Sequence, residues 1–366
     1  MRTNLKRLVG MVLLMVLTFF VANSSFAEYM IWSGADPTTN LWSSAANWVG
    51  GVRPNFNDIA SFTNDASSTQ QPDTYGANNT GMGLDFQTSG WTLYNTGVGA
   101  YIRVDAGLLI NSLGSGVNRV YQKITTSGSV GDIPVTVDAN STIVFLGGYY
   151  LFGDRVVYKG GGTIVWDGPD DTYVAYNPCV LSNDLSIIIN SEIGIGWFRV
   201  TEGTIGGNGI ARGYNYATSE IGGNATLSPG GNGEFGDLIG TFTMKANSAT
   251  VRHHLILKTG CTLKIEFDSV GNSDKLLYSG YGGGKVTIES GCTLSMYGGE
   301  FIDDGTYDVV ANEATDMTNI SGTFSTVTFN DAALDAEHFT VDYGTDAITV
   351  TVTGLGKPKG TVVFIQ

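Results

Sequence analysis

The chain has 366 residues, a net charge of −15 and an isoelectric point near 4.4. A chain this acidic is repelled by nucleic acid and by anionic membrane surfaces, so both partner classes are excluded. Charged residues make up only 14% of the sequence, and glycine occupies 51 positions, which is about twice its usual share. This composition is typical of a turn-rich β protein, and the length suffices for a substantial core in one domain.

The first residues read MRTNLKRLVGMVLLMVLTFFVANSSFAE. A basic start, an apolar run over 8–22 and a small-x-small exit at 25–27 predict a secretory signal peptide over residues 1–27. The competing interpretation, a membrane anchor, needs about 20 apolar residues, more than this run offers. Cleavage would move the net charge from −15 to −18, because the removed segment carries three basic residues and no acidic one. We therefore expect an exported protein, extracellular or on the cell surface with the periplasm as a further compartment, and no transmembrane segment after cleavage.

A recurring pattern runs through the rest of the chain: a small residue, then Thr, then Leu or a β-branched residue. The threonines that carry it are Thr92, Thr142, Thr163, Thr204, Thr226, Thr250, Thr262 and Thr293. Three of the intervals between them lie between 21 and 24, and two, 41 and 50, are about double, whereas 12 and 31 do not fit. A degenerate period of about 22 residues indicates a stack of coils, each with two or three short strands separated by Gly/Asn/Asp corners.

The segments TIVFL at 142–146 and LKIEF at 263–267 alternate in hydrophobicity, as half-buried strands do. One coil cannot bury its apolar side alone, but stacked coils close a continuous core at the ~4.8 Å strand spacing. No amphipathic helical stretch of ten or more residues follows the signal segment. The periodicity favours a β-solenoid and leaves antiparallel sandwiches open as the alternative.

Two stretches resemble a known family, the autotransporter-type passengers with their associated β-strand repeats. The later stretch presents, in order, Leu227-Ser228-Pro229-Gly230, the acidic strand residue Glu266, Asp274-Lys275-Leu276-Leu277 and Ile320-Ser321-Gly322-Thr323-Phe324. The earlier stretch resembles the opening module of the same proteins through Trp32, Gly34, Trp42, Asn47-Trp48, Gly51, Pro54, Asp58, Ala60 and Phe62.

The resemblance implies an all-β, right-handed parallel β-helix that is exported to or beyond the cell surface. It implies an aromatic N-terminal capping module over 28–62, a parallel β-helix over 63–353 and a C-terminal tail over 354–366. The outer-membrane barrel that ends self-exporting members has no counterpart in this sequence.

The tryptophans Trp32, Trp42 and Trp48, with Asn47, form an aromatic-rich start to the mature chain. They are candidates for a glycan-stacking face, because exposed aromatic side chains mark binding surfaces. They are also candidates for a cap, because a solenoid needs its first coil sealed by large side chains. We favour the cap.

Weak calcium candidates lie in FDSVGNSDKL, where Asp268, Asn272 and Asp274 offer oxygen ligands on a loop. The spacing does not reproduce an EF-hand loop, so ordinary turn chemistry is the competing interpretation. We expect no other cofactor.

The cysteines Cys261 and Cys292 occupy the same place in the repeated pentapeptides TGCTL and SGCTL. If those places stack in neighbouring coils, the pair comes within disulfide reach. However, the interval from Cys261 to Cys292 is long for one coil, and free cysteine also packs well as a small apolar residue. Cys179 is interpreted as unpaired and structural.

The sequence contains few groups for catalysis. His253 and His254 are adjacent and point to opposite faces of a strand, so they cannot chelate one metal together. A polysaccharide lyase or hydrolase would draw on the acidic pairs 170–171 and 303–304, with Arg199, Arg212 or Arg252 to stabilise charge.

We predict a secreted or cell-surface structural, adhesin-like protein that is not an enzyme and that presents a rigid rod to extracellular glycans or surface proteins. The alternative is a carbohydrate-binding or polysaccharide-cleaving β-helix. Several carboxylates and an Arg in a groove on one flank would favour the alternative, whereas a smooth flank of Thr, Ser and Asn would favour the scaffold.

Overall fold

A computed structural model of the chain describes residues 27–63, 71–75, 79–80, 82–97, 101–105, 108–126, 132–150, 155–169, 172–181, 183–213, 217–231, 233–235, 238–246, 253–280, 284–299, 301–313 and 320–355. The expected signal segment therefore lies outside the described residues, apart from Ala27. The fold is all-β, and the described helices are two short 3-10 turns, η1 (Ala45–Asn47) and η2 (Val49–Gly51). The part of the chain that is described contains no helix long and apolar enough to cross a membrane.

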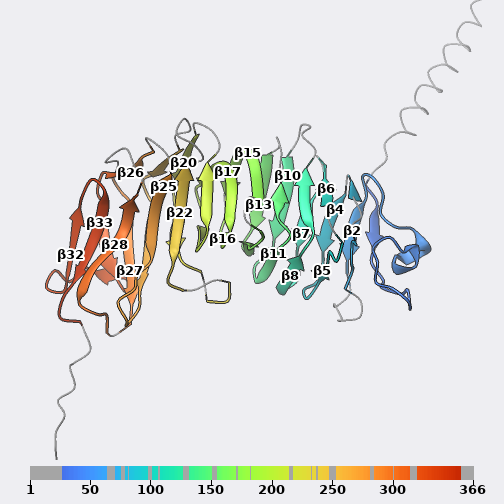
Figure 1. Ribbon diagram of the computed structural model, residues 1–366, viewed down its shortest axis with the longest axis horizontal. Helices are drawn as coiled ribbons and strands as arrows, with labels where there is room; N and C mark the ends of the chain where they lie inside the picture. Colours follow the sequence, from blue (N-terminus) through green and yellow to red (C-terminus); the bar gives the residue numbers. More distant parts are fainter. Residues whose placement is uncertain are drawn as a thin grey trace, which may run out of the picture.

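The strands stack in parallel rows along one axis, and each full coil places one strand on each of three faces (Figure 1). The first face holds β1 (Tyr29–Ile31), β2 (Ile59–Phe62), β4 (Gly83–Phe86), β7 (Ile110–Ser112), β10 (Asp132–Val137), β13 (Arg155–Gly160), the second halves of β15 (Thr172–Leu181) and β17 (Glu192–Val200), β20 (Ala217–Ile221), β23 (His253–Leu257), β26 (Val286–Ile288) and β29 (Ile320–Ser321).

The second face holds β5 (Thr92–Leu93), β8 (Gly116–Val120), β11 (Ser141–Phe145), β14 (Thr163–Trp166), β16 (Ser186–Ile189), β18 (Thr204–Gly207), β21 (Thr226–Pro229), β24 (Thr262–Phe267), β27 (Thr293–Gly298) and β30 (Thr326–Phe329). The third face holds β3 (Asn79–Thr80), β6 (Tyr101–Val104), β9 (Lys123–Thr126), β12 (Tyr149–Tyr150), the first halves of β15 and β17, β19 (Ile210–Gly213), β22 (Thr241–Ala246), β25 (Lys275–Gly280) and β28 (Gly305–Asn312).

Two long strands carry the backbone around a corner without a break. β15 pairs with β17 at both ends, with a register shift between Val174 and Pro178. β17 then pairs with β19 through its first half and with β20 through its second. The first face and the later part of the third face consequently form one sheet, which reaches 18 described strands with β32 (Phe339–Tyr343) and β33 (Ala347–Val352) at the end of the stack, while the second face belongs to a separate sheet of 11.

The predicted stacking of Thr-centred strands is confirmed on the second face. Thr142 lies opposite Thr163, and Thr204 lies opposite Thr226, in parallel strands. Ser186 occupies the coil between Thr163 and Thr204, so the interval of 41 between those threonines spans two coils, as expected. The unbroken hydroxyl ladder consists of Thr142, Thr163, Ser186, Thr204, Thr226, Thr262, Thr293 and Thr326.

Two details of the expected rhythm are wrong. The long interval between Thr262 and Thr293 is a single coil, because the two residues pair directly and the extra length lies in the turns between strands. Thr92 pairs with Arg119, and therefore stands two residues away from the ladder position. Thr250 lies outside the described residues.

An aliphatic column lies directly inside the hydroxyl ladder. Each ladder position from Thr142 to Thr293 is followed by a fully buried Ile or Leu, namely Ile143, Ile164, Ile187, Ile205, Leu227, Leu263 and Leu294. Each such side chain contributes about 1.5–3 kcal/mol when it is fully buried. The strand alternation therefore directs one apolar residue per coil into a shared core and leaves one hydroxyl per coil at the surface.

The glycine that precedes each cysteine allows a testable comparison. Gly260 and Gly291 both have positive φ, +85° and +87°, a backbone conformation that residues other than glycine rarely adopt. A Cβ at Gly260 would lie 2.2 Å from the backbone oxygen of Gly223, whereas at Gly291 it would lie 2.9 Å from a methyl group of Thr259. We expect Gly291→Ala to destabilise the protein by about 1–2 kcal/mol and Gly260→Ala by at least about 1 kcal/mol more. Urea unfolding of both variants checks this, and equal losses would contradict it.

The two ends of the stack differ from its middle. The N-terminal segment, blue in Figure 1, lies at one end, and β1 and β2 already pair in the first face. At the other end the direction reverses, because β31 (Ala332–Ala333) runs antiparallel to β30, and β33 (Ala347–Val352) runs antiparallel to both β28 and β32 (Phe339–Tyr343). The parallel arrangement thus ends before residue 353, and the reversed strands cover the last coil, which protects its hydrogen-bonding edge.

Candidate functional site

The aromatic residues singled out at the N-terminus lie together in the interior. Trp32, Trp42 and Trp48 are at most 2% exposed. The ring of Trp48 packs edge-on against both others, with centroids 5.1 Å from Trp32 and 4.8 Å from Trp42. The Asn47 side chain donates to the backbone oxygens of Thr39 and Leu41. No indole face among the three is open to a sugar, and their burial is what a cap requires.

Two of the three calcium candidates, Asp268 and Asn272, contact each other, whereas the Asp274 carboxylate contacts other segments. Asp268 accepts hydrogen bonds from the Val270 and Asn272 backbone amides and from the Asn272 side chain, at 2.7–2.9 Å, and so closes its own loop. These contacts lower the pKa of Asp268, although burial acts in the opposite direction. Within the described residues no cluster of three or more His, Cys, Asp or Glu side chains could hold a metal ion. Calcium binding at this loop stays a prediction.

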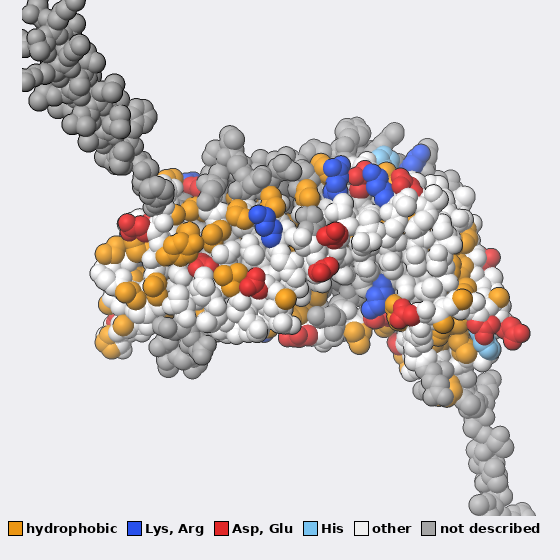
Figure 2. All heavy atoms as spheres, turned by 180° about the vertical axis from the view of Figure 1, so that it is seen from behind, with side chains coloured by type: hydrophobic (Ala, Val, Ile, Leu, Met, Phe, Trp, Pro, Cys, Tyr) orange, Lys and Arg blue, Asp and Glu red, His pale blue; other side chains and the backbone are white. Residues whose placement is uncertain are grey.

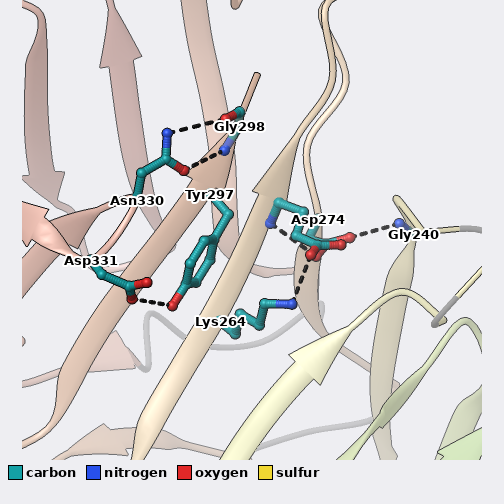
Figure 3. A network of polar contacts seen from close by, with 8 residues as sticks. Gly240, Lys264, Asp274, Tyr297, Gly298, Asn330 and Asp331 are labelled. Carbon is teal, nitrogen blue, oxygen red and sulfur yellow. Dashed lines mark hydrogen bonds and ion pairs between the residues drawn. The ribbon is translucent and has the colours of Figure 1, made fainter. Parts of the chain in front are cut away.

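Asp274 points away from that loop and joins distant segments. Its carboxylate is fully buried and accepts hydrogen bonds from the backbone amides of Gly240, at 2.8 Å, and Glu266, at 3.0 Å (Figure 3). Burial raises the pKa of Asp274 to about 7, against the effect of these two hydrogen bonds. Asp274 thereby fixes one end of the crossing loop, which we define as residues 230–240 between β21 and β22.

The crossing loop runs back over the outside of the second face. Its Phe235 packs against Val144, Val165 and Ile188, an apolar group on the outer side of that face. Leu238 is 54% exposed and stands between two hollows. The loop thus covers apolar surface contributed by β11, β14 and β16 of three successive coils.

The first of these hollows has a volume of about 350 Å³ and is lined mainly by small polar side chains and glycine. Its floor includes Thr204 and Thr226 of the hydroxyl ladder, with Gly206 beside them. A Cβ at Gly206 would lie 1.7 Å from the Ser228 backbone oxygen, so the close approach of these strands requires glycine there.

The second hollow, of about 400 Å³, lies beyond Leu238 over β24, β27 and β30. Polar side chains bridge successive coils at its edge: Tyr297 donates to Asp331 at 2.5 Å, and Asn330 exchanges two hydrogen bonds with the Gly298 backbone (Figure 3). Lys264 pairs with Glu266 at 2.7 Å. The contacts of Tyr297 and Asn330 join neighbouring coils, whereas the Lys264–Glu266 ion pair lies within β24.

A charged hollow of about 620 Å³ lies on the first face. Glu220 forms ion pairs with Arg199, at 3.1 Å, and with Lys258, at 3.0 Å. Glu289 lines the same hollow. Burial acts to raise the pKa of Glu220, but its contacts with Lys258 and Arg199 lower it below the usual value. Two carboxylates and an arginine therefore line one hollow on this flank, a combination that favours the carbohydrate alternative.

The histidine prediction is confirmed, because His253 is fully buried while His254 is not. Nε2 of His253 lies 2.7 Å from Oγ of Ser219, and burial, followed by the neighbouring His254, lowers the pKa of His253 to about 4. Among the other groups considered for catalysis, Arg252 and the acidic pair 170–171 lie outside the described residues. Asp304, from the acidic pair 303–304, accepts a hydrogen bond from the backbone amide of Leu355.

Cys261 and Cys292 do come together. Both thiols are free and buried, and their Sγ atoms lie 3.3 Å apart. The sequence located this pair through the repeated pentapeptide. The sequence did not predict that Leu238 lines two hollows or that Arg199 pairs with Glu220. Both arrangements depend on neighbouring coils and on turns of irregular length.

Fold and site together define an all-β, solenoid-like protein of stacked parallel coils, with a hydroxyl-lined flank and a charged hollow at Glu220. No family model, no curated protein and no solved structure matches this chain.

Proposed function

We propose that this chain is an exported, right-handed parallel β-helix with a structural, adhesive role at the cell surface or outside the cell. The observation that carries the proposal is the hydroxyl ladder, which runs unbroken over eight coils of one flank. The resemblance to autotransporter-associated repeats supports the handedness, and the basic and apolar N-terminal sequence supports export.

Stacked coils suit display because each is hydrogen-bonded to its neighbours along the whole rod. The carboxylates of Asp274 and Glu266 are already engaged within the fold, since Asp274 accepts two backbone hydrogen bonds and Glu266 pairs with Lys264. Figure 2 shows one face on which Lys, Arg, Asp and Glu side chains are scattered rather than gathered in one patch. Such a rod offers contact area and rigidity, which are the properties an adhesive scaffold needs.

The contact surface that we propose for adhesion lies in the N-terminal half. Of ten exposed large hydrophobic residues in the described part of the chain, seven fall between Tyr29 and Tyr121, and hydrophobic side chains gather over this half in Figure 2. Tyr94 and Tyr121, on successive coils, stack with ring centroids 5.7 Å apart and are about 40% exposed. Exposed aromatic groups of this kind mark interaction surfaces.

The second candidate function is binding or cleavage of a carbohydrate. The charged hollow favours it, because Arg199, Glu220 and Glu289 lie on one flank. Carboxylates paired across a groove are the groups that glycoside cleavage requires.

Binding of the mature protein to arrays of glycans and extracellular matrix proteins, with and without calcium, distinguishes the two. For the adhesive function we expect Tyr94→Ala with Tyr121→Ala to reduce binding at least about tenfold, and Glu220→Gln and calcium removal to change little. Tyr343→Ala, an exposed tyrosine at the opposite end, is the matched control. Loss of binding in Glu220→Gln alone, or release of oligosaccharide from a bound glycan, would favour the second function instead.

A further inference from the structure

Cys261 and Cys292 occupy one place in two successive coils. The strands that follow them, β24 and β27, pair in parallel and in register over their whole length, from Thr262 with Thr293 to Phe267 with Gly298. Each cysteine stands directly before that ladder, at the same corner, and both side chains are 0% exposed. Their Sγ atoms are 3.3 Å apart.

We propose that these two cysteines form a disulfide that joins neighbouring coils, and that the bond forms during folding, before the coils close over the sulfur atoms. The pairing is independent of the proposed function, whereas its occurrence in the cell rests on the proposed export, because disulfides persist in oxidising compartments.

The backbone is placed for such a bond. Neighbouring strands lie about 4.7–4.9 Å apart, and disulfides span Cα separations of about 4.4–6.8 Å. The sulfurs need to approach by about 1.3 Å from their present distance to reach the ~2.05 Å of a disulfide bond. A rotation about the Cα–Cβ bonds supplies a shift of this size without moving the ladder.

The reduced pair has a further contact that the disulfide replaces. The Cys292 thiol lies 3.1 Å from the backbone oxygen of Leu257 and 3.2 Å from that of Lys258, as a weak donor at the end of β23. Both oxygens have other partners in the ladder or the turn, since Glu289 donates to Leu257 and Cys261 donates to Lys258. Oxidation therefore leaves neither carbonyl without a donor.

The order of events follows from burial. The thiolate is the reactive form of cysteine, and burial raises the pKa of both Cys261 and Cys292. In the folded rod the sulfurs are protonated and closed to an oxidant. The reaction must therefore take place while the corner is still open, with the register of β24 and β27 bringing the sulfurs together.

The oxidant belongs to the class of reactive disulfides, either a small molecule or a protein. One cysteine thiolate attacks a sulfur of that disulfide, forms a mixed disulfide and releases one thiol. The second cysteine thiolate attacks the cysteine sulfur of the mixed disulfide and releases the second thiol. Two electrons pass from the pair to the oxidant, and the two cysteine protons leave to solvent and the released thiols.

The bond closes the loop from Cys261 to Cys292, which contains β24, β25 and β26 and amounts to one full coil. Closing a loop of this length restricts the unfolded chain, and we expect the unfolding midpoint to rise by about 5–10 °C. The effect is centred on the coil that carries Asp274.

The test uses residues 28–366, unfolded and then refolded with or without oxidised glutathione. Cys179→Ala retains the pair and removes the remaining cysteine, whereas Cys261→Ala and Cys292→Ala each break the pair. After oxidative refolding, wild type and Cys179→Ala should yield a peptide that joins Cys261 to Cys292, and should resist alkylation at both positions in denaturant. The same oxidant added to protein that was folded under reducing conditions should produce little of this peptide.

Two results would overturn the proposal: both cysteines of Cys179→Ala stay open to alkylation after oxidative refolding, or the bond forms and lowers the unfolding midpoint. Rapid oxidation of the folded, reduced protein would overturn the proposed timing. If the pair oxidises in vitro but is reduced in protein taken from its own cells, the pairing is supported and the proposed export is overturned.

Discussion

Replacing Trp48 with alanine is expected to destabilise the protein by about 3–5 kcal/mol, the range for truncating a large buried aromatic side chain. Trp48 is 2% exposed and contacts both Trp32 and Trp42 edge-on. Its indole nitrogen also donates to the Trp42 backbone oxygen at 2.9 Å. The substitution would leave a cavity at the end of the stack, beside β1 and β2, and remove one hydrogen bond.

Denaturant unfolding and limited proteolysis measure this effect. If the aromatic module is a cap, Trp48→Ala should also expose the N-terminal coils to protease before the C-terminal ones. Phe56→Ala is the matched control, because Phe56 lies in the same module but is 58% exposed, and its loss should change stability by less than about 0.5 kcal/mol. A loss below about 1 kcal/mol in Trp48→Ala would contradict the capping role.

The second large effect is a pair of opposing pH dependences. His253 has a folded pKa of about 4, against 6.5 for the free group, so the unfolded chain takes up the proton first as the pH falls. The stability that neutral His253 provides is therefore complete above pH 6.5 and is lost as the pH falls towards 4, by about 3 kcal/mol. Besides burial, the charge of His254 opposes protonation of the imidazole and the Lys245 backbone favours it, while Ser219 contacts Nε2.

Asp274 acts with the opposite sign. Its folded pKa of about 7 lies above the ordinary 3.8, so the folded protein keeps the proton that the unfolded chain has lost. Its contribution is complete below pH 3.8 and is lost as the pH rises towards 7, by about 4 kcal/mol. Between about pH 4 and pH 7 the two contributions to the free energy of unfolding partly cancel. The stability of the wild type should therefore depend less on pH than the stability of a variant that lacks either group.

Urea midpoints between about pH 4 and pH 7.5 separate the two contributions. Relative to wild type, His253→Gln should gain stability towards acid pH, and Asp274→Asn should gain stability towards neutral pH. The slope with pH is the readout, because each substitution also adds an offset that does not vary with pH. Parallel profiles for wild type and His253→Gln would show that His253 titrates normally, contrary to its burial.

The amino-acid sequence by itself determined which residues face inward and that most of the Thr-centred strands share a row, with Thr92 as an exception. A hydroxyl residue followed by Ile or Leu places one polar and one apolar side chain on opposite sides of a strand, whatever the neighbouring coil contributes. The same local pattern located the cysteine corners, because Gly260 and Gly291 mark identical turns.

Only the tertiary structure decided the length of each coil and the meetings across coils. The interval from Thr204 to Thr226 and the longer one from Thr226 to Thr262 each correspond to one coil, since the turns between strands absorb extra residues without disturbing the ladder. The contacts of Asp274 with Gly240 and of Glu220 with Lys258 join residues 34 and 38 positions apart. Such contacts depend on how the coils stack and on turns of irregular length, and no local sequence pattern encodes which residues these turns bring together.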